Sequence, residues 1–296
     1  MATSLRVLGV TVNHNTSHFA ELMLRTLFLT NDLSDIDFCL VVLDNASNDE
    51  HLERLQAYLA GQGIPFTQTG LDNSVAVEKH GTVLTRFVQE RGDCTHYLFL
   101  DSDMWFVEAN TIPALLRELV ESPNTVFANQ ARIYGYYADK VIEGRDGVAG
   151  AGSLDGVTWE TVCGNPVVKS ARYTTRIAYR CSPVCSLVVN IPTFRRVVGA
   201  FGLNPAISFG AGEARHYDTF GLMTHVMATH GFRFIVSSKT VNHFTETVYR
   251  PELRMPKDRD CLKMLRELQA GRGMELENFY LSDWVKQKRQ NSGQQD

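Results

Sequence analysis

Short apolar runs alternate with stretches of helical spacing over the first third of the chain, and this alternation limits the fold more than any other feature. Each run is rich in β-branched or aromatic residues, as buried strands are. Strands that alternate with helices at such spacings form a mostly parallel sheet with right-handed crossovers. The sequence therefore predicts an α/β fold with strands at Leu5–Val12, Phe38–Leu43, Ile64–Gly70 and Thr95–Leu100.

The helices expected between these strands carry recognisable start and stop residues. Thr16 or Ser17 is the candidate N-cap of the first helix. Ser47 and Glu50 have the S-x-x-E spacing of a capping box, which predicts a second helix that ends at Gly61. A third helix is expected to start near "DNSVAV" and to end before "RGD".

The second half of the chain is less regular. The glycine-rich stretch 144–164 predicts loops. A strand is expected in "VCSLVVN", a helix in "IPTFRRVVGAFG", a helix in "HYDTFGLMTHVMATHG", and one or two strands in "FRFIVSSKTVNHF". Residues 251–296 read as a C-terminal helical extension with a disordered tail, after a main domain over 1–250.

Size and composition are those of an ordinary globular protein. The chain has 296 residues and a net charge of −4, which disfavours a globally basic nucleic-acid binder. Six cysteines without a CxxC pair predict reduced thiols. We expect no signal peptide, and the longest uncharged segment, Cys181–Phe194, is too short for a membrane span. A cytoplasmic protein is expected, with peripheral membrane contact left open.

Two carboxylates, Asp101 and Asp103, follow the fourth predicted strand directly. In open α/β sheets, ligands bind outside the carboxyl ends of the strands. Neighbouring carboxylates repel each other unless a cation lies between them, and hard oxygen ligands suit Mg²⁺ or Mn²⁺. The alternative is that Asp101 caps the turn and Asp103 is solvated.

Other polar residues at predicted strand ends join this picture. Asp44 and Asn45 follow the second strand and suit hydrogen bonds to a base or ribose, although they also suit a turn. His243 follows a late strand and is a candidate third metal ligand, or a structural histidine. Asp218 is a candidate general base, with Glu213 in reserve; in a first helical turn Asp218 also suits the helix dipole.

Two common nucleotide-binding motifs are missing from the sequence. No G-x-G-x-x-G follows the first strand, and no G-x-x-x-x-G-K-[ST] occurs. A dinucleotide-binding fold of the usual kind and a P-loop NTPase are therefore disfavoured.

Taken in order, the motifs resemble those of family 2 glycosyltransferases of the GT-A fold. The resemblance covers about Leu5 to Phe244 and rests on "VTVNHN", "VVLDNASND", "DNSVAVEKHG", "YLFLDSDMWF", "CSLVVNIPTFRRVVGAFG", "YDTFGLMTHVMATHGFRF" and "VNHF". It implies a GT-A sheet flanked by helices, and transfer of a sugar from a nucleoside-diphosphate donor, such as a UDP-sugar, to an acceptor hydroxyl with inversion.

The resemblance also implies roles for individual residues. It assigns the divalent metal, Mn²⁺ or Mg²⁺, to Asp101, Asp103 and His243, and the catalytic base to Asp218. Contacts to the donor nucleotide fall on Thr11, Asn13, Asn15, Asp44, Asn45, Asp72, Asn73, Lys79, Asp101 and Ser102. The chain departs from the family at Ser74, where a glycine is usual, and in "RHYDTF", where the family has E-D-x-D-L. The base therefore stays open between Asp218 and Glu213.

The acidic residues at the strand ends are compatible with two other functions. A sugar-nucleotide nucleotidyltransferase also uses acidic metal sites at strand ends, but it normally needs a basic glycine-rich loop near the first strand, which "VTVNHNTSH" lacks. A non-catalytic nucleotide- or glycan-binding module is the third possibility. The acceptor is open among glycans, lipids, proteins, small molecules and modified nucleic acids.

Overall fold

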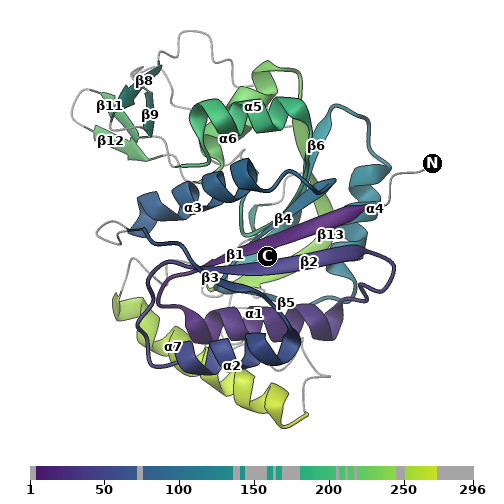
Figure 1. Ribbon diagram of the computed structural model, residues 1–296, viewed down its shortest axis with the longest axis vertical. Helices are drawn as coiled ribbons and strands as arrows, with labels where there is room; N and C mark the ends of the chain where they lie inside the picture. Colours follow the sequence, from purple (N-terminus) through teal and green to yellow (C-terminus); the bar gives the residue numbers. More distant parts are fainter. Residues whose placement is uncertain are drawn as a thin grey trace, which may run out of the picture.

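The strands predicted at the start of the chain lie side by side in the computed structural model (Figure 1). Strand β1 (Arg6–Asn13) pairs in parallel with β2 (Asp37–Asp44) and with β4 (His96–Asp101), and β2 pairs in parallel with β3 (Phe66–Gln68). Residues Asn13 and Asp44 face each other in the register, as do Val12 and Asp101. The predicted parallel α/β arrangement is confirmed, and it brings the polar strand ends to one edge.

The structure describes ten stretches of the chain. They are 5–71, 76–135, 141–143, 159–162, 165–168, 181–204, 207–210, 213–216, 219–244 and 251–271.

Within these residues, nine strands form the main sheet, and its second half mixes strand directions. Strand β10 (Cys185–Val189) runs antiparallel to β4 and to β6 (Val126–Gly135). Strand β13 (Arg233–His243) is parallel to β6 and antiparallel to β5 (Met104–Phe106). The order is β3-β2-β1-β4-β10-β6-β13-β5, and β7 (Val141–Glu143) pairs with β6.

Helices cover both faces of this sheet (Figure 1). One face carries α1 (Ser17–Thr30), α2 (Leu52–Gln62) and α4 (Thr111–Val120), and α7 (Pro251–Gln269) lies against α1. The other face carries α3 (Ala76–Glu90), α5 (Pro192–Phe201) and α6 (Gly221–Thr229). No helix in the described ranges is both long and apolar enough to cross a lipid bilayer.

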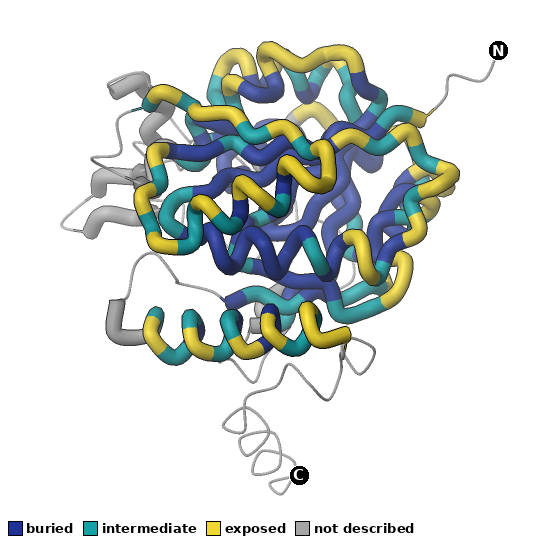
Figure 2. Tube along the Cα trace, turned by 60° about the horizontal axis from the view of Figure 1, so that its bottom comes forward, coloured by how far each residue is buried: buried dark blue, intermediate teal, exposed yellow. Residues whose placement is uncertain are grey.

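Alternation along the strands feeds a core on each face, because successive side chains point to opposite sides of a sheet. Tyr97 and Phe99 of β4 pack with α3 and α5, whereas Leu98 and Leu100 pack with α1 and α4. Figure 2 shows these central strands as buried along most of their length. The sheet edge that carries the polar strand ends is therefore supported by a well-packed core on both faces.

The glycine-rich stretch is not all loop, so that prediction is wrong in part. Strand β8 (Trp159–Val162) lies inside it. It pairs with β9 (Asn165–Val168), which joins β11 (Ile207–Gly210) and β12 (Glu213–His216) in a second, four-stranded sheet. Pairing between segments this far apart in sequence leaves no local pattern to read.

Two predicted helix starts also need correction. The helix expected from His216 begins only at Gly221, after Phe220 in a left-handed conformation, and His216 lies in strand β12. The capping box at Ser47 does not form, since α2 begins at Leu52 and ends at Gly63 instead of Gly61. The hydroxyl of Ser47 instead bonds to the loop that precedes α1.

The remaining predicted elements are present with small shifts. Thr16 takes the N-cap position of α1 but makes no side-chain capping bond there. Helix α5 starts at Pro192, as expected, and β10, β13 and α7 fall on the predicted segments. The five described cysteines are free thiols.

Candidate active site

Three predicted metal ligands meet at one end of β4. Asp101 is the last residue of β4, a two-residue turn contains Asp103, and β5 follows. Because His243 stands opposite Met104 in the antiparallel pair of β13 and β5, the register places it beside Asp103. The Nε2 atom of His243 lies 2.9 Å from Oδ1 of Asp103 and 3.8 Å from Oδ2 of Asp101.

This triad fits a divalent cation. Each residue offers one ligand atom, and these atoms all lie within 4.8 Å of one another. The side chains are only 19%, 13% and 15% exposed for Asp101, Asp103 and His243, so water screens the two carboxylates poorly. Two carboxylate oxygens and an imidazole nitrogen suit Mn²⁺ or Mg²⁺. In the described parts of the chain, Asp101, Asp103 and His243 form the group of three acidic, histidine or cysteine side chains that could hold a metal ion.

The electrostatics of His243 show the same negative potential. Burial alone lowers the pKa of this imidazole, but the charge and hydrogen bond of Asp103, together with the charge of Asp101, raise the pKa above its usual value. The two carboxylates thus favour positive charge on or beside the ring.

His80 belongs to the same site, although no sequence motif marks it as a site residue. It lies on α3, with Nε2 3.6 Å from Oδ1 of Asp101. Its Nδ1 hydrogen-bonds the hydroxyl of Thr219 at 3.4 Å, and its side chain is 27% exposed. His80 therefore connects the metal triad to the segment just before α6. Only its place in the first turns of the helix that follows the third strand could have marked it in the sequence.

Asn13 and Asp44 form a buried pair at the ends of β1 and β2. The Asn13 amide nitrogen donates to Oδ1 of Asp44 at 2.8 Å and to the Ser47 hydroxyl at 3.0 Å. The other Asp44 oxygen accepts the backbone N–H of Ser47 at 3.1 Å, and both members of the pair are fully buried. The carboxylate of Asp44 therefore holds two loops together, and its predicted nucleobase contact stays a prediction.

Asn45 extends this frame toward β3. Its backbone N–H donates to the carbonyl of Asn13 at 2.8 Å, and its side-chain oxygen accepts the Thr69 hydroxyl at 2.9 Å. Thr11 lies deeper in β1, where its buried hydroxyl has no hydrogen-bond partner within the described residues. The ends of three parallel strands are thus tied into one floor.

The turn between the two aspartates is tied to the loop after β1. The Ser102 hydroxyl lies 2.8 Å from the hydroxyl of Thr16. Asn15, next to Thr16, has a left-handed backbone with φ 53° and donates its N–H to the Ser47 hydroxyl at 2.9 Å. The predicted metal end and the predicted nucleotide end are therefore parts of one continuous site.

No protein-family model and no curated protein matches this sequence, whereas solved structures match its shape. A mannosyltransferase from Pyrobaculum calidifontis, in complex with GDP-Man and Mn²⁺, is 12% identical with a TM-score of 0.52. That match covers 90% of this chain and 65% of the mannosyltransferase, so this chain spans a little under two thirds of that protein.

Two further glycosyltransferase structures are similar at lower scores. TarS from S. aureus is 14% identical with a TM-score of 0.48, over 92% of this chain and 44% of TarS. GalNAc-T7, with UDP, GalNAc and Mn²⁺, is 14% identical with a TM-score of 0.49, over 97% of this chain and 56% of GalNAc-T7.

The sheet order and the first of these matches decide the architecture. The chain has the GT-A fold. The predicted fold class is thereby confirmed, and the Asp101–Asp103 turn lies in this GT-A fold where a parallel strand ends beside the neighbouring antiparallel one.

Several residues predicted for the GT-A site lie outside what the structure describes. Asp72, Asn73 and Asp218 are outside the described residues altogether. For Lys79 and Glu213 only the backbone is described, in α3 and β12 respectively. Their assignments to the nucleotide and to base catalysis stay predictions.

Proposed function

We propose that this protein is a metal-dependent glycosyltransferase that moves a sugar from a nucleoside-diphosphate donor to an acceptor hydroxyl. One observation carries the proposal: the Asp101, Asp103 and His243 side chains converge at a strand end of a GT-A fold. We further propose that 1–250 form the transferase domain, with 251–296 as its C-terminal helical extension.

The three ligands would hold Mn²⁺ or Mg²⁺ against the donor diphosphate. When bound, the cation neutralises negative charge on the departing nucleoside diphosphate. The protein's own part is to fix the ligand geometry. Asp103 is fixed through its backbone, because the N–H of Phe244 donates to the carbonyl of Asp103 at 2.9 Å.

The floor made by β1, β2 and β3 is the proposed place for the nucleoside. Asn13, Asp44 and Asn45 are buried and mutually hydrogen-bonded, which gives a preorganised surface beside the metal triad. The unpartnered hydroxyl of Thr11 lies under this floor. A UDP-sugar is the donor proposed, and contacts from Asp72, Asn73 and Lys79 to its nucleotide are proposed with it.

Asp218 is the proposed general base, which takes the proton from the acceptor hydroxyl as the new glycosidic bond forms. Its neighbour Thr219 supports this role, because Thr219 hydrogen-bonds His80 and His80 faces Asp101. In the sequence, Asp218 directly precedes Thr219, the residue that hydrogen-bonds His80. A base on the side opposite the leaving group implies inversion, and Glu213 remains the reserve candidate.

A screen of nucleotide sugars with Mn²⁺, read out by release of nucleoside diphosphate, tests the function. We expect Asp103→Ala to lower turnover at least about 100-fold, since it removes a ligand for the charge-neutralising group. Asp35→Asn is the matched control, because Asp35 is exposed and remote from the triad. An unchanged rate in Asp103→Ala would remove the metal assignment.

A second variant tests the base. We expect Asp218→Asn to lower transfer about 100-fold or more while donor binding stays intact. Release of pyrophosphate from a nucleoside triphosphate and a sugar phosphate would indicate the nucleotidyltransferase instead. Binding of UDP and Mn²⁺ without turnover of any nucleotide sugar would indicate a binding module.

A further inference from the structure

Helix α7 packs in the same cluster as two residues that lie next to metal ligands in the sequence. Trp105 lies two residues after Asp103, Phe244 directly follows His243, and the two rings have centroids 4.4 Å apart. Phe244 also packs on Phe19 of α1 at 4.8 Å. The same buried cluster includes three residues of α7, which are Cys261, Met264 and Leu265. Packing alone therefore ties the C-terminal helix to the residues beside two metal ligands.

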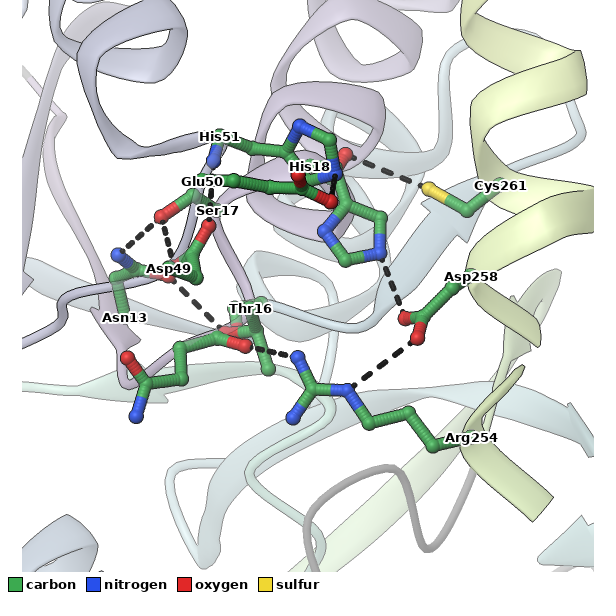
Figure 3. A network of polar contacts seen from close by, with 12 residues as sticks. Asn13, Thr16, Ser17, His18, Asp49, Glu50, His51, Arg254, Asp258 and Cys261 are labelled. Carbon is green, nitrogen blue, oxygen red and sulfur yellow. Dashed lines mark hydrogen bonds and ion pairs between the residues drawn. The ribbon is translucent and has the colours of Figure 1, made fainter. Parts of the chain in front are cut away.

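A polar relay of three side chains, His18, Asp258 and Arg254, runs beside this cluster (Figure 3). The carboxylate of Asp258 on α7 lies 2.8 Å from Nε2 of His18 and 3.5 Å from Nε of Arg254. His18 is almost fully buried, with a side chain only 3% exposed. The thiol of Cys261 donates to the carbonyl of His18 at 3.4 Å. Asp258 is thus held by the buried imidazole and in turn holds the guanidinium of Arg254.

The relay ends on the backbone of Asn15. A terminal nitrogen of Arg254 donates to the carbonyl oxygen of Asn15. The side-chain oxygen of Asn15 accepts the backbone N–H of Asn48 at 2.8 Å, and its own N–H donates to Ser47. Asparagine adopts a left-handed φ such as this +53° more readily than most residues other than glycine, and the contacts from other segments fix that conformation.

A small displacement of Asn15 would affect two parts of the site, the nucleoside floor and the Asp101–Asp103 turn. Asn13, two residues earlier, bonds Asp44, and Thr16, one residue later, bonds Ser102 in the turn between the two aspartates. A change in the Asn15 peptide therefore reaches the nucleoside floor and the Asp101–Asp103 turn at once.

We propose that Arg254 is a positioning residue of the donor site, which acts through Asn15. The guanidinium, held by Asp258 and through it by His18, fixes the loop after β1 so that the nucleoside floor and the metal triad keep their relative positions. This inference rests on the proposed function, because it names how the C-terminal helix sets donor affinity. The planar guanidinium bonds a carboxylate and a carbonyl at once, which a lysine ammonium reproduces poorly.

The matched control lies on the same helix. Arg259 pairs with Asp260 at 3.5 Å and its side chain is 74% exposed, so Arg259→Gln removes an equal charge from α7 without touching the relay. Asp258→Asn removes the charge that holds Arg254, and Arg254→Lys keeps charge but not geometry. These three variants, like Arg254→Gln, keep every apolar side chain of α7.

Two measurements on the full chain test the inference. Isothermal titration with UDP or GDP in saturating Mn²⁺ should show affinity about tenfold weaker in Arg254→Gln and Asp258→Asn, as for loss of outer-sphere support. Affinity for Mn²⁺ alone should fall less than nucleotide affinity does, because Arg254 contacts the Asn15 carbonyl and not a metal ligand. Arg259→Gln should match the parent, and Arg254→Lys should recover the affinity only in part.

Amide hydrogen exchange separates this inference from the proposed function. The N–H groups of Asn15 and Asn48 should exchange about tenfold faster in Arg254→Gln than in Arg259→Gln, because the loop contacts loosen. The inference would be overturned if Arg254→Gln left the exchange rates unchanged. It would also be overturned if the parent bound the nucleotide and Arg254→Gln bound it equally well. A parent that binds neither UDP nor GDP would contradict the proposed function, and exchange at Asn15 would still decide whether Arg254 fixes the loop.

Discussion

At the scale of single residues, His80 shows what a fold adds to a motif. The D-x-D pair was readable from the sequence because two carboxylates at a strand end need a cation or solvent. His80 comes from a different helix, and only the folded chain shows its ring 3.6 Å from Asp101. Its second nitrogen is engaged by Thr219, so the ring is oriented before any ligand arrives. Such a partner orients a metal-binding carboxylate.

Removal of His80 should therefore weaken metal binding without removing a ligand. We expect His80→Ala to lower Mn²⁺ affinity about tenfold, because outer-sphere partners of metal ligands typically matter by that factor. Titration of Mn²⁺ followed by electron paramagnetic resonance measures this directly. His230→Ala is the control, since His230 is exposed and its Nδ1 bonds the nearby backbone carbonyl of Val226. Equal Mn²⁺ affinity in both variants would show that His80 does not act on Asp101.

At the scale of elements, sequence patterns predicted the strands and helices whose formation depends mainly on neighbouring residues. The β-branched runs and helical spacing of the first third gave β1 to β4 and α1 to α3 nearly in place. The sequence predicts no element over 107–143, which contains α4 and β6, and predicts only loops over 144–164, which contains strand β8 of the second sheet. Ser47 looked like a helix cap, but Asn13 and Asn15 use its hydroxyl instead. The missed strands and the missed cap share one cause, since long-range contacts outweigh local preference there.

Two helical glycines give a matched test of packing between elements. A Cβ added at Gly81 of α3 would lie 2.5 Å from the Cα of Asn204 and 2.6 Å from the carbonyl oxygen of Leu203, whereas one added at Gly199 of α5 would meet no atom within 4 Å. Gly81→Ala should therefore lower the free energy of unfolding by about 1–3 kcal/mol, since backbone has to shift. Gly199→Ala should raise it by about 0.5–1 kcal/mol through helix propensity.

Urea unfolding of both alanine variants against the parent measures these changes. The same sign at both positions would contradict the close approach of α3 to the segment after α5. Because Gly81 follows His80, the Gly81→Ala protein should also bind Mn²⁺ more weakly, whereas the Gly199→Ala protein should bind it as the parent does.

At the scale of the whole molecule, the GT-A sheet explains why the site was partly predictable. Parallel strands bring their carboxyl ends to one edge, so Asn13, Asp44 and Asp101 had to gather there. The sequence alone did not show that α7 contacts this edge, because the contact joins residues more than two hundred positions apart, such as His18 and Asp258. The C-terminal helix is therefore packed as part of the site's support.

The same sheet also couples global stability to pH through His96. This histidine lies in β4 between Val7 of β1 and Val189 of β10, and it is 5% exposed. Burial lowers its pKa from 6.5 to about 4. The unfolded chain therefore binds a proton at higher pH than the folded chain does, and between these two pKa values the free energy of unfolding falls as the pH falls. The contribution is fully present above pH 6.5 and is lost toward pH 4.

The expected loss is up to about 3 kcal/mol, because one pKa unit corresponds to about 1.4 kcal/mol. Urea unfolding at several pH values between 7.5 and 4.5, on the parent and on His96→Gln, isolates this term, since the other titrating groups are common to both proteins. The variant should be less stable than the parent at pH 7.5, because it loses packing, but its stability should fall less steeply on acidification. Parallel curves for the two proteins would mean that His96 titrates normally, and hence that the centre of the sheet is open to water.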